Sequence, residues 1–241
     1  MKMTTAAKKT MGMVLIGVSA FVLNGSVIHA KGIHFQLPEN IYILFDASGE
    51  NFNCEALRKS NHSVVKHHVM QRIRQGHVKT VYAGIFSKYT TFVGSTEVRN
   101  KRGSDMIRAK HMVRKSMALI DKAYNNMGSM YSRLQGGREF PYARDVTGAI
   151  AKVINTIRRN GDKKAHIVIA STMIQSLNKK LVVKNLKEEH IKLPEGTDMI
   201  VFNKSWVCSD GAEYKKLDSM AATESFWTKV IDGKVAFDNA Y

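Results

Sequence analysis

Short, continuous apolar runs mark the predicted strands of this chain. They lie at 41–45, 80–86, 166–170 and 198–202. A strand that is buried on both faces of a parallel sheet has this unbroken pattern, because neither face meets water. Residues 89–94, rich in Thr and Phe, follow the second run closely. They predict an antiparallel partner strand that is joined to it by a short hairpin at Ser87-Lys88.

Segments with helical spacing separate these runs. Apolar residues at intervals of three or four predict one helix over 104–127 and another over 146–157, which Asn160-Gly161 ends. Weaker helical patterns cover 54–74 and about 214–231. Strands that alternate with helices predict an α/β fold, with a mostly parallel central sheet, one antiparallel edge hairpin and helices on both faces.

The first 30 residues have the pattern of a secretory signal peptide. A positive start (Lys2, Lys8 and Lys9) precedes an apolar run at 11–23, and a small residue, Ala30, marks a cleavage position. The apolar run is shorter than the roughly 20 residues that a membrane-spanning helix needs. We therefore expect a leader at 1–30 and one domain at 31–241, periplasmic or secreted. An uncleaved leader that anchors the chain to the membrane is the alternative.

Export affects the interpretation of the two cysteines. Cys54 and Cys208 lie far apart in the sequence, and thiols in an oxidising compartment can form a disulfide. Two buried free thiols are the alternative. The sequence leaves both open, because it does not give the separation of the two Cα atoms.

The chain is strongly basic. Its formal net charge is +17, and removing the three lysines of the leader, which has no acidic residue, leaves +14 (17 − 3). Such a charge predicts attraction to nucleic acid, an anionic membrane surface or an acidic protein. Few aromatic residues lie among the basic ones, so a stacking platform for single strands is not indicated. A solvated basic surface without a single ligand is the alternative.

The candidate binding residues follow the predicted strands, at the sheet edge where α/β proteins bind ligands. Asp46 and Ser48 leave the first strand two residues apart, so their oxygens can point into one crevice. Oxygen ligands of this kind suit Mg²⁺ or Ca²⁺. Such a triplet on its own also serves as a turn that caps the next helix.

In this position the triplet resembles the metal-ion-dependent adhesion site of von Willebrand factor A (vWA) domains. That family has Asp-x-Ser-x-Ser on its first loop, a Thr before a central helix and an Asp after the fourth strand. Residues 144–150 resemble the start of that helix, and 167–173 resemble the strand and its turn. Phe226-Trp227 and Gly233 resemble a terminal helix of bacterial members. The similarity covers about 40–235 and implies the Rossmann-like, three-layer vWA fold.

The chain departs from the family pattern at three positions. Glu50 stands in place of the second Ser, Arg144 in place of the Thr, and Thr172 in place of the Asp, while Thr147 lies one turn after Arg144. We hypothesise that the metal is lost and that Arg144 pairs with Asp46 or Glu50, because a guanidinium can bind carboxylates with two donors.

Two other interpretations of these residues stay open. In the first, Asp46 and Ser48 only cap a helix and Arg144 is exposed. In the second, Mg²⁺ or Ca²⁺ is bound by Asp46, Ser48, Glu50 and Asp145, although an adjacent guanidinium disfavours a cation. Apart from this ion, no cofactor is expected.

No enzyme motif accounts for the chain. A Gly-x-Ser-x-Gly elbow, a His-Glu-x-x-His pair and a glycine-rich phosphate loop are all absent from the sequence. A phosphatase of the haloacid dehalogenase type needs a second carboxylate where Ser48 stands. His62, His67 and His68 lack the spacing of a metal helix and are predicted to lie on the surface.

We therefore expect an exported, non-enzymatic protein-interaction module of vWA type. It would bind a protein partner through the predicted loops 46–54, 128–144 and 171–178. The alternative is a basic, envelope-associated component of a bacterial conjugation or secretion apparatus that binds a polyanion or an acidic partner. Salt-sensitive binding to DNA or heparin would favour the alternative.

Overall fold

The computed structural model describes residues 39–48, 55–76, 78–98, 106–136, 144–173, 191–202 and 224–238. All of them belong to one compact unit, Gln36–Tyr241. The predicted leader at 1–30, Glu50, and both Cys54 and Cys208 lie outside the described residues.

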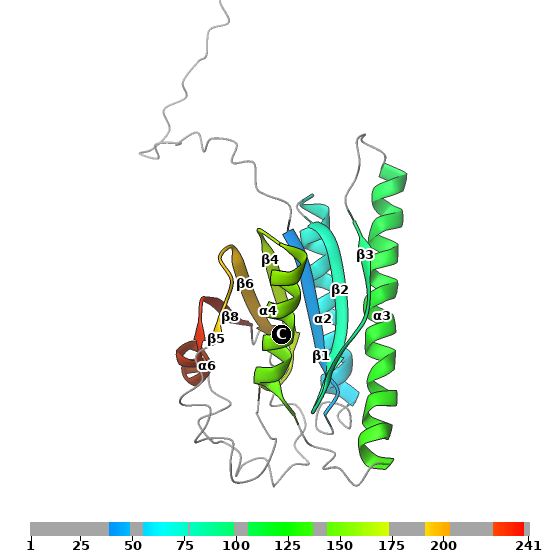
Figure 1. The fold of residues 1–241 in the computed structure, drawn as a ribbon. Coiled ribbons are helices and arrows are strands. Elements are labelled where there is room, and N and C mark those ends of the chain that lie inside the picture. Colours follow the sequence, from blue (N-terminus) through cyan, green and yellow to red (C-terminus); the bar gives the residue numbers. More distant parts are fainter. Residues whose placement is uncertain are drawn as a thin grey trace, which may run out of the picture. The chain divides into compact units, whose positions relative to one another are not determined.

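A six-stranded sheet forms the centre of this unit (Figure 1), in the order β3-β2-β1-β4-β6-β8. Its strands are β1 (Glu39–Asp46), β2 (Val78–Phe86), β3 (Thr90–Glu97), β4 (Ala165–Ala170), β6 (Thr197–Phe202) and β8 (Lys234–Asp238). Every neighbouring pair is parallel except β2 and β3, which are antiparallel. Two short strands, β5 (Ile191–Lys192) and β7 (Ile231–Asp232), form a separate parallel pair.

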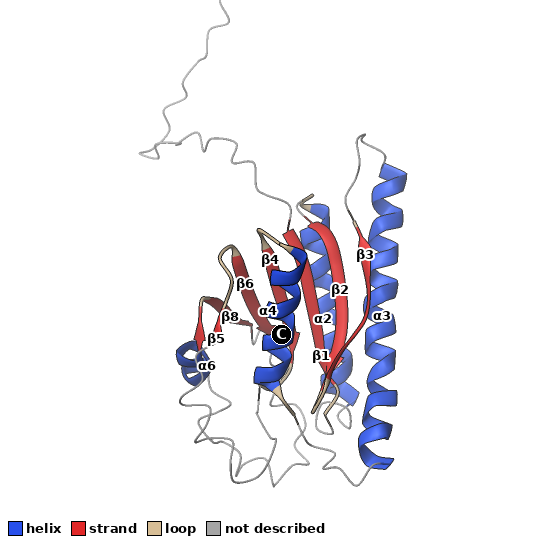
Figure 2. Cartoon of the chain, viewed as in Figure 1, coloured by secondary structure: helices blue, strands red, loops and turns tan. Residues whose placement is uncertain are grey.

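Helices cover both faces of the sheet (Figure 2). Side chains alternate along β1, so that Ile43 and its like-facing neighbours share a buried cluster with α2 (Glu55–Arg74) and α3 (Met106–Gly136). Leu44 points the opposite way, into a cluster with α4 (Val146–Asn160) and α6 (Glu224–Val230). Each face therefore has its own apolar core. The predicted fold class, a Rossmann-like, three-layer α/β fold with a mostly parallel central sheet and one antiparallel edge hairpin, is confirmed.

The start and end of α4 follow the sequence closely. Asp145 caps its first turn by accepting a hydrogen bond from the backbone N–H of Gly148. Gly161 ends it with a left-handed φ of 64°, a conformation that glycine adopts without a Cβ penalty. This start places Arg144 directly before the helix, at the carboxyl edge of the sheet.

The prediction of a long loop over 128–144 is wrong in its first half, because α3 continues to Gly136. Met127 and Tyr131 are buried at four-residue spacing, so the apolar stripe continues past Gly128. Packing along this stripe offsets the roughly 1 kcal/mol that a glycine costs inside a helix.

The end of the chain also differs from the prediction. Within the expected helix at 214–231, residues 224–230 are helical and Ile231 begins β7, whereas 214–223 lie outside the described residues. β8 was not expected, although Val235 and Phe237 alternate with more polar neighbours as in an edge strand. No helix in the described segments is long and apolar enough to cross a membrane.

Candidate functional site

Five buried polar residues meet where β1 and β4 end at the carboxyl edge of the sheet. Asp46 is the last residue of β1, Ser48 follows it, Ser171 and Thr172 follow β4, and Arg144 precedes α4. Arg144, Ser48 and Ser171 are fully buried, and Thr172 is 6% exposed. We call these five residues the Arg144 cluster.

The guanidinium of Arg144 joins three segments of the chain. Its Nε lies 2.7 Å from Asp46 Oδ2. Nε and Nη2 both donate to Ser48 Oγ, at 3.0 and 2.6 Å. Nη1 donates to Thr172 Oγ1 at 2.5 Å. A single side chain therefore connects the end of β1 to the turn after β4 and to the start of α4.

Both oxygens of the Asp46 carboxylate accept hydrogen bonds. Besides the ion pair with Arg144, its Oδ2 accepts from Ser171 Oγ at 2.6 Å, and its Oδ1 accepts from the backbone N–H of Ser48 at 2.9 Å. These donors replace the water that a buried carboxylate loses. The pair is thus satisfied within the protein.

The described residues of this cluster do not fit a divalent cation. Asp46 is their only carboxylate, and the positive guanidinium lies where a cation bound to Asp46 and Ser48 would lie. The same contact shows that Arg144 is buried, so the interpretation with an exposed Arg144 is wrong. Glu50, the other acidic candidate of the first loop, lies outside the described residues.

Asp145 and Thr147 belong to the first turn of α4. Asp145 Oδ1 accepts from the backbone N–H of Gly148 at 2.8 Å and from Thr147 Oγ1 at 3.2 Å. A Cβ on Gly148 would lie 2.0 Å from Asp145 Oδ2, so glycine leaves room for this cap. The backbone N–H of Asp145 donates to Ser87 O, which ties the helix start to the β2–β3 hairpin.

Replacing Asp145 by Ala is expected to lower the free energy of unfolding by about 1 kcal/mol, the usual effect of losing a helix cap. Chemical denaturation of the full chain measures this change. Because the expected role of Asp145 is capping, addition of Mg²⁺ or Ca²⁺ should leave the difference in stability between wild type and Asp145→Ala unchanged. A larger difference with either ion would identify Asp145 as a metal ligand.

Two further residues support the turn after β4. The sequence placed them in the turn and in the terminal helix but did not indicate that they contact the site. Met173 has a φ of 57°, which is uncommon for a residue with a side chain. Its backbone N–H donates to Ser171 Oγ, and its carbonyl accepts from Trp227 Nε1 at 2.9 Å. Trp227 on α6 is fully buried. The C-terminal helix is thus bonded to the turn that carries Thr172.

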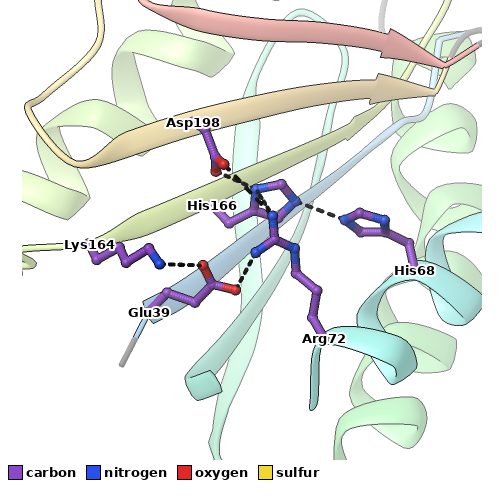
Figure 3. Close-up of polar contacts among 6 residues, drawn as sticks. All are labelled: Glu39, His68, Arg72, Lys164, His166 and Asp198. Atoms are coloured by element: carbon purple, nitrogen blue, oxygen red, sulfur yellow. Dashed lines mark hydrogen bonds and ion pairs between the residues drawn. The ribbon is translucent and has the colours of Figure 1, made fainter. Parts of the chain in front are cut away.

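A second polar cluster lies between α2 and the sheet (Figure 3). We call it the His68–His166 cluster; its members are Glu39, His68, Arg72, Lys164, His166 and Asp198. The two imidazoles share a hydrogen bond between their Nε2 atoms at 2.8 Å. His166 Nδ1 lies 2.5 Å from Asp198 Oδ1, and Arg72 Nη1 donates to Glu39 Oε1 at 2.6 Å.

The prediction that the α2 histidines lie on the surface is therefore wrong for two of the three. His68 is partly buried, and burial lowers its pKa from 6.5 to about 4, with a further lowering by the neighbouring His166 and Arg72 side chains. His62 is also partly buried and pairs with Asp121 at 2.7 Å. His67 alone is exposed, as predicted. The helical pattern of α2 was too weak to show which side faces the sheet.

No family model and no curated protein matches this chain. Solved structures with a similar fold include the PilB minor pilin from Streptococcus sanguinis, at 13% identity and a TM-score of 0.45, covering 86% of this chain and 59% of that one. A von Willebrand factor type A protein from Catenulispora acidiphila is similar at 9% identity and a TM-score of 0.38, covering 69% and 33%.

Manganese-loaded TRAP from Plasmodium vivax is similar at 15% identity and a TM-score of 0.35, with 69% of this chain and 57% of that chain covered. The chain therefore spans less than two thirds of the length of each of these three proteins. At such identities the likeness concerns the fold alone.

Proposed function

We propose that this chain is an exported, non-enzymatic protein-interaction module of vWA type that binds its partner without a metal ion. The observation that carries the proposal is the buried ion pair between Arg144 and Asp46 at 2.7 Å. In the resemblance described above, Asp46, Ser48 and Thr172 stand at metal-binding positions. Here the oxygens of all three contact one guanidinium instead.

The chemistry of the Arg144 cluster favours a structural role over catalysis. A catalytic acid, base or nucleophile must come within hydrogen-bond distance of a substrate. Ser48 and Asp46 are at most 1% exposed, and their oxygens already accept bonds from the protein. The cluster fixes the positions from which three chain segments leave the sheet. Segments at this edge of an α/β sheet are the usual place for ligand recognition.

The test uses the immobilised full chain and the extracellular fraction of the source cells. We expect one protein to be retained equally in EDTA and in Mg²⁺, and to stay bound at about 0.5 M salt, where surface electrostatics are screened. Calorimetric titration with Mg²⁺, Mn²⁺ and Ca²⁺ should give no binding heat. Retention only with a divalent ion would contradict the metal-free mode. Retention only at low salt would favour the polyanion-binding alternative.

A further inference from the structure

The side of α3 that faces away from the sheet carries five exposed basic side chains. Its exposed basic residues are Lys110, Arg114, Lys115, Lys122 and Arg133. With 31 residues, the helix is about 46 Å long at 1.5 Å per residue. It lies beside the edge strand β3 (Figure 1). Its buried side chains, such as Ile120 and Met127, belong to the apolar cluster shared with the sheet and α2. We call the five basic residues the α3 basic face.

These charges are not neutralised by the described residues around them. None of the five forms an ion pair with another described residue. Asp121 is the one acidic residue in the sequence of α3, and its carboxylate binds Lys66 Nζ at 2.8 Å and His62 on α2. Among the described residues, therefore, no carboxylate offsets the five charges of the α3 basic face.

The chemistry of the face distinguishes between anionic partners. Protein interfaces usually bury aromatic and apolar side chains at their centre. Among the described residues, Tyr89 is the only large apolar side chain that is exposed, and it lies outside α3. A binding site for single-stranded nucleic acid needs aromatic rings between its cations, and the α3 basic face has none. What remains is an extended anionic ligand that is bound by positive charge alone.

We propose that the α3 basic face docks the protein on the surface of a bilayer that contains anionic lipid. A straight helix about 46 Å long matches a flat layer of headgroups. Lys115 and Lys122 lie seven residues apart, hence on the same side and roughly 10 Å from each other. With no apolar group to insert, binding is electrostatic and reversible. A leader at 1–30, as the sequence predicts, would also direct the chain to a membrane. This inference is independent of the partner proposed for the Arg144 cluster.

The experiment measures sedimentation of the full chain with vesicles. Vesicles of phosphatidylcholine with about 30% phosphatidylglycerol should bind the protein at about 0.1 M salt and release it at about 0.5 M. Neutral phosphatidylcholine vesicles report any contribution from the apolar run at 11–23. The double variant Lys115→Gln/Lys122→Gln should bind the anionic vesicles on the order of tenfold more weakly.

The matched control removes the same charge from the opposite face of the sheet. Arg158 and Arg159 are exposed on α4, and Arg158→Gln/Arg159→Gln should reduce vesicle binding by less than twofold. An equal loss in both double variants would mean that net charge acts without a docking face, and it would overturn the proposal. So would equal binding to neutral vesicles. Binding of duplex DNA that depends on Lys115 and Lys122, without vesicle binding, would assign the face to nucleic acid instead.

Discussion

Replacing Arg144 by Ala is expected to lower the free energy of unfolding by about 3–5 kcal/mol. The guanidinium is fully buried, and its loss leaves the carboxylate of Asp46 without its countercharge in the interior. The hydroxyls of Ser48 and Thr172 lose their N–H donors at the same time. For a unit of this size, such a loss corresponds to a melting temperature lower by roughly 10 °C.

Thermal and urea denaturation of the full chain measure this effect. Arg114→Ala is the matched control, because Arg114 is exposed on α3 and its loss should change stability by about 0.5 kcal/mol at most. Arg144→Lys keeps the charge but not the planar fork, so its stability should fall between wild type and Arg144→Ala. The double variant Arg144→Ala/Asp46→Asn should lose less stability than the sum of the losses in the two single variants. If Arg144→Ala lowers the free energy of unfolding no more than Arg114→Ala does, the ion pair between Arg144 and Asp46 makes no net contribution to stability.

The core of the fold could be predicted because its signals are local. Four of the six strands of the central sheet are apolar runs bounded by polar residues. A strand that is buried on both faces requires apolar residues at nearly every position, so its sequence is easy to recognise. The cap and the glycine that bound α4 are likewise local. The extent of α3 was missed because residues 128–144 are rich in Gly, Tyr and Arg and show no regular apolar spacing, although the segment begins at Gly128 inside the helix. Packing against the sheet, which no short window contains, keeps that glycine helical.

The candidate site could be predicted only in part. Asp46 and Arg144 are 98 residues apart in the sequence, and the expectation that they pair came from a family resemblance, not from local pattern. The support of the turn after β4 by Trp227 depends on where the C-terminal helix packs. The His68–His166 cluster joins α2, β1, β4 and β6, so its members come together only once the strand order is fixed.

The His68–His166 cluster leads to a second large effect, a loss of stability in mild acid. The pKa of His68 is about 4 in the folded protein, against an ordinary value near 6.5 when the chain is unfolded. Between these values the unfolded state binds more protons, so lowering the pH favours unfolding. The stabilising contribution is complete above pH 6.5, decreases as the pH falls to 4, and does not decrease further below 4. Allowing for the partial exposure of His68, we expect a loss of about 2 kcal/mol.

The groups around His68 act in both directions. His166 on β4 and Arg72 on α2 lower its pKa further, whereas Asp238 on β8 and Asp198 on β6 raise it, so burial, the largest effect, sets the direction. Because the Nε2 atoms of His68 and His166 share one hydrogen bond, the two rings cannot both carry a proton there. Burial opposes the charge on Asp198, but its bond with His166 and the nearby cations outweigh burial and lower its pKa below 3.8. The effect of Asp198 therefore belongs to a lower pH range.

Urea denaturation at a series of pH values from 7.5 to about 4 checks this prediction. His68→Gln should be less stable at neutral pH and should show a clearly smaller slope between pH 6.5 and 4, since the amide does not titrate. A residual dependence of stability on pH, with the same sign, is expected from His62, because burial also lowers the pKa of this residue. His67→Gln is the matched control on the same helix, because His67 is exposed, and it should keep the full slope. If the stability of His68→Gln depends on pH as strongly as that of wild type, the acid sensitivity belongs to another group. If the stability of wild type does not change between pH 6.5 and 4, His68 titrates normally in the folded chain.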